Sequence, residues 1–104
     1  MNTLTIEKQI VRAQYVTITE DSLIVDIDDG RAVSVPLEWY PRLLYGTPEE
    51  HANWRLIGKG EGIHWPDLDE DISVENLLAG NPSGESQRSF KRWLELRSIH
   101  GKQS

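Results

Sequence analysis

The sequence predicts an α+β fold in which a small antiparallel sheet carries short helices and a C-terminal helix. Hydrophobic and polar residues alternate up to residue 36, which is the period of a half-buried strand. Prolines, helix-capping residues and glycines then follow at short intervals, as expected for short helices. The chain has 104 residues, so we expect residues 1–104 to form a single domain.

The predicted sheet is a three-stranded antiparallel meander joined by a fourth strand. In the second strand Leu23, Val25 and Ile27 share one face, which is expected to point toward the core. Gly30 supplies the positive φ of a tight hairpin, and Pro36 ends the ladder because it has no N–H. The strands are expected at residues 11–18, 22–28, 31–35 and 54–58, with the last returning to the meander.

Helix signals fill the rest of the chain. Thr47, Pro48 and Glu50 form a capping box with proline as the first helical residue. Ser73 is the expected N-cap of a helix of about two turns that ends at Gly80. We also expect a short helix from Pro41 to Gly46 and a C-terminal helix at about residues 85–99, with Phe90, Trp93 and Leu94 on one side.

Composition limits the function classes. The absence of cysteine excludes thiol catalysis, cysteine metal sites and disulfides. No apolar run reaches the roughly 20 residues of a membrane span, and the first residues lack the apolar region of a secretory signal. We therefore expect a cytoplasmic protein of bacterial type with no membrane contact.

The net charge of −6 is unevenly distributed. Residues 1–87 hold 16 acidic and six basic side chains, or −10, whereas residues 88–104 hold five basic and one acidic, or +4. An acidic body repels nucleic acid, and a basic C-terminal helix complements its own dipole and packs beside that body. Nucleic-acid contact through this helix remains an alternative, although five positive charges are few for a specific DNA-binding surface.

The segment HWPDLDED, residues 64–71, is the strongest candidate for chemistry. An EF-hand calcium loop that began at Asp67 would need glycine at position 72 and glutamate at position 78, and the chain has Ile72 and Leu78 there. Dinucleotide, phosphate-loop and nucleophile-elbow motifs are also absent from the sequence. The alternative is a metal site, a small-ligand site or an enzyme that uses His64 with Asp67 and Asp69 within the acidic loop Asp67–Asp71.

We expect this segment to be a packed turn that leads into a helix. Trp65 and Pro66 would point inward and the acids outward. Acids that are neighbours on a loop usually face water, whereas catalytic pairs need a set separation across a pocket. We therefore expect no catalytic residue, no metal and no cofactor.

Two elements of the chain resemble DUF2442, a bacterial family of unknown function. They are SVPLEWYPRLLYGTPEE and WRLIGKGEGIHWPDLDEDISVENLLAG, which contain the P-L-x-W-[FY]-P-R-L and I-H-W-P-x-L-D-E-D-I-S-V-x-x-L-L patterns of the family, with departures at Gly46 and Asn76. The resemblance covers about residues 12–80 and implies a curved antiparallel sheet with short helices. It also implies relatives fused to helix-turn-helix domains, and others paired with a second small protein in a toxin–antitoxin-like arrangement. No catalytic residue is implied.

We therefore expect a non-catalytic protein-interaction module of unknown molecular function, the antitoxin-like member of a two-gene pair. The resemblance implies that the partner would be a protein encoded by a neighbouring gene, and an acidic surface complements a basic partner. A homodimer through the sheet edges or the aromatic surface is a further option. Aromatic side chains would anchor the partner and acids would steer it. The expected partner-binding residues are Trp39, Tyr40, Arg42, Trp65, Asp67, Asp69, Glu70 and Asp71.

Overall fold

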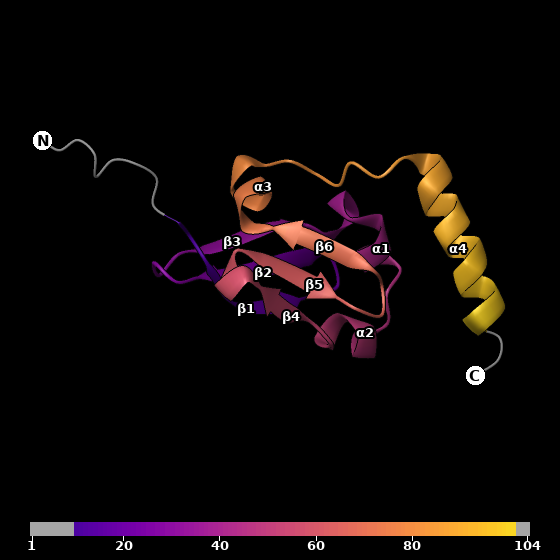
Figure 1. Cartoon of the computed structure of the whole chain (residues 1–104), viewed down its shortest axis with the longest axis horizontal. Coiled ribbons are helices and arrows are strands. Elements are labelled where there is room, and N and C mark those ends of the chain that lie inside the picture. The colour runs from indigo at the N-terminus through magenta and orange to yellow at the C-terminus, as the bar shows by residue number, and fades with distance from the viewer. Residues whose placement is uncertain (1–9, 102–104) are drawn as a thin grey trace, which may run out of the picture.

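Two three-stranded antiparallel sheets form the body of the protein, with strand orders β1–β2–β3 and β4–β5–β6. The structure is a computed structural model that describes residues 10–101, with side chains described as far as residue 98; Lys102, one of the five C-terminal bases, lies outside this range. The strands are β1 (Ala13–Ile18), β2 (Ser22–Ile27), β3 (Ala32–Pro36), β4 (Arg55–Ile57), β5 (Gly62–Trp65) and β6 (Glu70–Ser73). The helices are α1 (Pro41–Leu44), α2 (Pro48–Ala52), α3 (Val74–Ala79) and α4 (Gln87–Gly101), with 3-10 turns at Leu37–Trp39 and Gly58–Gly60. The predicted α+β class is confirmed (Figure 1).

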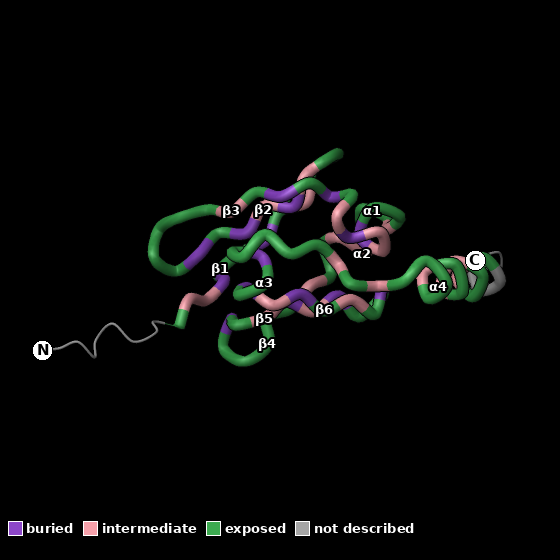
Figure 2. Tube along the Cα trace, turned by 90° about the horizontal axis from the view of Figure 1, so that it is seen from above, coloured by how far each residue is buried: buried purple, intermediate pink, exposed green. Residues whose placement is uncertain are grey.

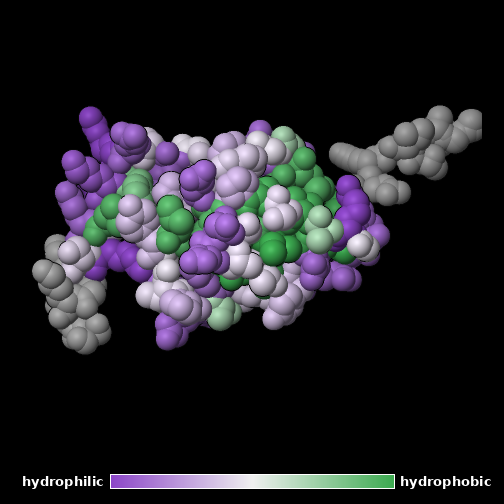
Figure 3. Space-filling model, turned by 180° about the vertical axis from the view of Figure 1, so that it is seen from behind, coloured by the Kyte–Doolittle hydropathy of each residue, from purple (hydrophilic) through white to green (hydrophobic). Residues whose placement is uncertain are grey.

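The meander is confirmed with the predicted alternation. In β2, Leu23, Val25 and Ile27 are buried and their neighbours are more exposed. The turn between β2 and β3 contains Gly30 with a φ of 97°, which a residue without a Cβ adopts at little cost. Ile24 is only half-buried, because the pleat of β2 directs it to the face opposite Leu23 and Val25. Viewed from behind, the surface of the body shows a hydrophobic area (Figure 3).

The fourth predicted strand does not return to the meander, so that prediction is wrong. β4 pairs with β5, and β5 pairs with β6, to make a second sheet. β5 and β6, which have four residues each, are not among the predicted strands. They pair because Ile63 and Ile72, which lie opposite each other, are both buried against the first sheet.

The core lies between the two sheets, as the buried segments of Figure 2 show. Its largest buried side chain is Trp65, from β5. The first sheet contributes Val16, Leu23, Val25, Ile27 and Val35, and the second contributes Ile63, Trp65 and Ile72, with Leu43, Leu68, Val74 and Leu77 from the connections and helices. Burial of this apolar surface is the main stabilising contribution, at about 25 cal/mol for each Å².

The predicted helix caps are confirmed. The Thr47 hydroxyl accepts from the Glu50 N–H at 3.1 Å, and the Glu50 carboxylate accepts from the Thr47 N–H at 2.9 Å. Ser73 caps α3, and Gly80 ends it with a φ of 77°. α4 stands at one end of the body after an extended connection (Figure 1) and begins two residues later than expected. Across the described residues, no helix combines the length and the apolar character that a membrane span requires.

Candidate functional site

The acidic segment forms the tip of the hairpin between β5 and β6, and we call residues 64–71 the acidic hairpin. Trp65 and Leu68 are fully buried, and the Leu68 N–H donates to the Trp65 carbonyl at 3.2 Å. Asp69 has a φ of 52°, a conformation that aspartate tolerates better than most residues. The expected packed turn is therefore confirmed for Trp65. Pro66 is exposed instead of inward, because Leu68 fills the inward position of the turn.

Arg42 of α1 ties the hairpin to the body. Its Nη1 donates to the carbonyl oxygens of Leu68 and Asp69 at 3.3 and 3.0 Å. Its Nη2 donates to Glu85 Oε2 at 2.6 Å, and its Nε donates to both oxygens of that carboxylate at 3.0 and 3.1 Å. The hydrogen bonds with Glu85 raise the pKa of Arg42, and those with Arg42 lower the pKa of Glu85. The two groups are therefore both charged and neutralise each other.

Glu70 differs from the other acids of the hairpin. It lies opposite Trp65 in the register, which places both side chains on the inner face of the sheet. Burial raises the pKa of Glu70 to about 7; Arg42 opposes this rise, and neighbouring carboxylates add to it. Tyr40 also has a raised pKa, caused first by burial and then by Glu70. The expectation that the acids point outward is therefore wrong for Glu70, because the pleat of β6 directs it toward Trp65.

The other acids do not gather around His64. The His64 Nδ1 pairs with the Asp71 carboxylate, and the Asp67 carboxylate accepts from Asn53 Nδ2 at 2.9 Å. The Asp69 side chain is 88% exposed. Over the part of the chain that the structure describes, no three His, Asp or Glu side chains are placed to hold a metal ion. His64, Asp67 and Asp69 are thus not brought together as the alternative metal site requires.

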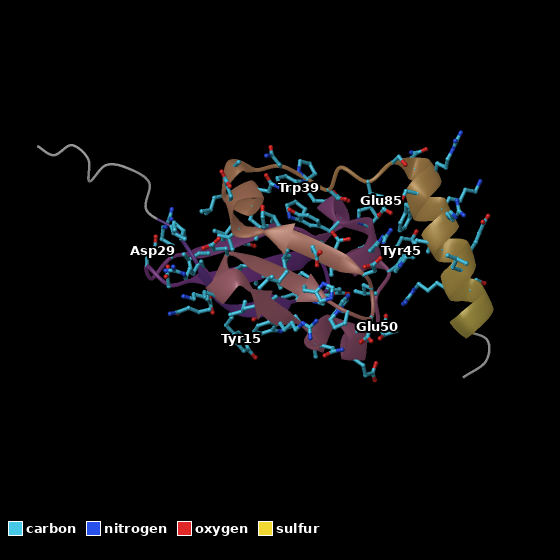
Figure 4. The ribbon with its side chains drawn as sticks, in the orientation of Figure 1. Tyr15, Asp29, Trp39, Tyr45, Glu50 and Glu85 are labelled. Atoms are coloured by element: carbon cyan, nitrogen blue, oxygen red, sulfur yellow. The ribbon has the colours of Figure 1, made fainter. Side chains whose placement is uncertain are left out.

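The predicted aromatic anchors divide between core and surface. Trp65 is fully buried, and its Nε1 donates to the His51 carbonyl at 3.2 Å. Tyr40 is also buried, and its hydroxyl donates to the Asn81 carbonyl at 3.2 Å. Trp39 is half-buried beside the segment that leads from α3 to α4 (Figure 4). Trp65 and Tyr40 therefore stabilise the core and are not available to touch a partner, whereas Trp39 keeps an accessible edge.

α4 docks on the same end of the body. The guanidinium groups of Arg42 and Arg97 lie 5.2 and 4.9 Å from the centroid of the Trp93 ring, distances at which cations are attracted to aromatic faces. Arg97 Nη2 also donates to Glu50 Oε1 at 2.6 Å. Glu85, Tyr45 and Glu50 lie along the side of the body that faces α4 (Figure 4). Glu85 is not predictable from the sequence, because no local signal marks an ion pair between residues 43 positions apart.

Comparison with known proteins identifies a family and two similar folds. The family described as protein of unknown function (DUF2442) matches residues 13–83. The crystal structure of a protein of unknown function from Rhodospirillum rubrum is similar with a TM-score of 0.63 and 25% identity, over 74% of this chain and 95% of that chain. The solution structure of an uncharacterized protein from Chromobacterium violaceum is similar with a TM-score of 0.61 and 20% identity, over 70% of this chain and 69% of that chain. No curated protein matches.

Proposed function

The chain belongs to the DUF2442 family, and on that premise we propose that it is a non-catalytic interaction module that binds a basic protein through the acidic hairpin. The observation that carries the proposal is the way Arg42 holds the hairpin. Two of its hydrogen bonds go to the backbone of the tip, at Leu68 and Asp69. The Asp69 and Asp71 side chains remain 88% and 69% exposed. The hairpin thus presents carboxylates to solvent on a backbone that is held in place.

A surface of this kind suits electrostatic recognition. Arg42 pairs closely with Glu85, at 2.6 Å, and only at 3.7 Å with the carboxylate of Asp69. Glu85 therefore offsets most of the charge of Arg42, and the exposed carboxylates keep most of their field. Because the backbone of the tip is already ordered, the hairpin loses less conformational entropy when a partner binds. Exposed charges mainly increase the association rate and the selectivity for an oppositely charged partner.

The proposed partner is a small basic protein encoded by a neighbouring gene, with this chain as the antitoxin-like member of the pair. A toxin directed at nucleic acid carries a basic surface, and an acidic hairpin that covers such a surface would compete with the nucleic acid. The half-buried Trp39 and the side chain of Arg42 would lie at the edge of the contact.

The test is capture from the native cell, with light crosslinking and mass spectrometry, followed by calorimetry with the purified partner. We expect one stoichiometric partner. The variant Asp69→Asn/Asp71→Asn should bind it on the order of tenfold more weakly at low salt, with a smaller difference at high salt. Asparagine at position 69 retains the tolerance for positive φ.

The matched control is Asp26→Asn/Glu49→Gln, which removes the same charge from exposed residues of β2 and α2. We expect this control to bind like the wild type to within about twofold. Equal affinities of the hairpin variant and the wild type at low salt would refute the role of the hairpin. A cell extract without any stoichiometric partner would refute the interaction function itself.

A further inference from the structure

A groove of about 730 Å³ lies on the outer face of the β4–β5–β6 sheet, at the end of the strands far from the hairpin tip. Ile57, Gly62 and Ser73 are neighbours across the three strands at this end. Gly62 has no side chain, and a Cβ built there would stand 3.7 Å from Ile57 Cδ1. The absence of a side chain at Gly62 therefore leaves the middle of the sheet open beside Ile57.

The groove is lined by apolar side chains that the fold leaves exposed. Ile10, Ile57 and Leu78 are 55%, 43% and 37% exposed, and all three line the groove. They come from the segment before β1, from β4 and from α3. Exposed apolar side chains that gather around one concave surface are typical of a protein-binding site, whereas single exposed ones are normal.

The charge of the groove has one sign. Among the residues that the structure describes, Glu61, Asp71 and Glu75 line it, and no lysine, arginine or histidine does. Such a groove repels nucleic acid and anionic lipid and attracts a cationic segment. Asp71 also belongs to the acidic hairpin. The groove is therefore continuous, along β6, with the surface that we propose for binding the partner.

Acids alone do not distinguish this groove. A smaller one, of about 540 Å³, is lined by Glu20, Asp21 and Glu38. Among the lining residues that the structure describes, Leu44 is the only large hydrophobic side chain with substantial exposure. The larger groove differs because it combines the same number of acids with three such apolar side chains. The smaller groove therefore provides a matched control.

We propose that the larger groove binds a basic amphipathic segment of the partner protein. Bulky apolar side chains of that segment contact Ile57 and Leu78, and its lysine or arginine side chains pair with Glu61 and Glu75. The inference rests on the proposed function and specifies the chemistry of the partner. The occupant is a segment of another protein, because the chain's own basic helix, α4, is already held on its own body by Arg97 and Glu50.

The probe is a fluorescein-labelled peptide of leucine and lysine, with the leucines on one face of a helix, added to the full chain at low salt. Two matched peptides replace lysine by glutamate or leucine by serine. Anisotropy should show binding of the first peptide only. Amide spectra of the ¹⁵N-labelled protein should show shifts at Gly58 and Gly62, which line the groove.

Matched variants then compare the two grooves. Each pair of variants removes the same charge, or shortens the same type of side chain, in one groove or in the other. We expect Glu61→Gln/Glu75→Gln and Leu78→Ser each to weaken peptide binding at least about fivefold. The controls Glu20→Gln/Glu38→Gln and Leu44→Ser should weaken it less than about twofold. Equal weakening by both sets would overturn the proposal, because general attraction to an acidic protein would then explain the binding.

Two further outcomes separate the groove from the proposed function. If the captured partner is lost with Asp69→Asn/Asp71→Asn but unaffected by Leu78→Ser, the interaction function stands and the groove proposal fails. If no partner is captured although the peptide binds the groove, the interaction function fails and only the preference for basic amphipathic chemistry stands. An oligomer that Leu78→Ser converts to a monomer would identify a second copy as the occupant and overturn the proposal.

Discussion

Replacing Glu70 by glutamine should stabilise the protein at neutral and alkaline pH and have little effect below about pH 4.5. Burial raises the pKa of Glu70 from 4.5 to about 7. Between these two values the folded protein binds more protons at this site than the unfolded chain does. The free energy of unfolding of the wild type therefore falls as the pH rises through this window. Glutamine has the shape of the protonated acid and does not ionise, so the variant escapes this loss.

The magnitude follows from the difference between the two pKa values. A change from 4.5 to about 7 corresponds to about 3 kcal/mol. Glu70 is half-buried, and solvent screens part of the penalty, so we expect about 2 kcal/mol. This value is a large fraction of the stability of a small domain, which is about 5–15 kcal/mol.

Urea unfolding of the wild type and Glu70→Gln at pH values from about 4 to about 8 measures the effect. The difference in free energy of unfolding should be small at the acidic end, grow between about pH 4.5 and 7, and level off above. Glu75→Gln, which removes a carboxylate from the exposed surface of α3, is the control for the loss of one charge. A difference that does not depend on pH would show that attraction to Arg42 balances burial and would refute the raised pKa of Glu70. A variant less stable than the wild type at about pH 8 would show that this attraction outweighs burial.

Three further perturbations test the fold and the junction with α4. Gly60→Ala should lower the free energy of unfolding by at least about 2 kcal/mol, because Gly60 has a φ of +101° and a Cβ would stand 2.7 Å from the Ala13 carbonyl. Gly84→Ala, where a Cβ meets nothing within 4 Å, is its control in thermal unfolding, and equal effects would contradict the close approach. Leu68→Ala should cost about 3 kcal/mol in urea, since the side chain is fully buried; a cost below about 1 kcal/mol would mean that the hairpin tip is not packed. Trp93→Ala should speed hydrogen exchange in α4 while β2 keeps its protection, and equal loss in both would show that helix and body unfold as one unit.

The first sheet was predictable from local signals, and the second was not. β2 repeats its alternation over six residues, with Leu23, Val25 and Ile27 buried, and Gly30 marks the turn that follows. β5 and β6 have only four residues each, and Glu70 occupies an inward position. β5 does alternate, with Ile63 and Trp65 buried, but four residues are too few for a period of two to be recognised in the sequence. The choice of partner for β4 depends on contacts between the sheets, which no local pattern encodes.

The candidate site was predictable only in part, for a related reason. The acids of the hairpin and the cap at Ser73 are local features, and the sequence indicates both. An abundance of aromatic residues does not distinguish core from surface, so Tyr40 and Trp65 were expected at a contact although both are buried. The hydrogen-bond partners of Arg42 lie 26 to 43 residues away in the chain. Only the folded arrangement reveals that this arginine organises the site.

The contacts of Arg42 link the acidic hairpin to α4, two segments that are not adjacent in the sequence. The same guanidinium binds the backbone of the hairpin, the carboxylate of Glu85 and the face of Trp93 in α4. Coupling through a shared group is reciprocal. A ligand that shifts the hairpin changes the free energy with which α4 docks on the body. Displacement of α4 changes the free energy of binding of that ligand by the same amount. A fluorescent label on the exposed side of α4 would then act as a remote reporter of what is bound at the hairpin.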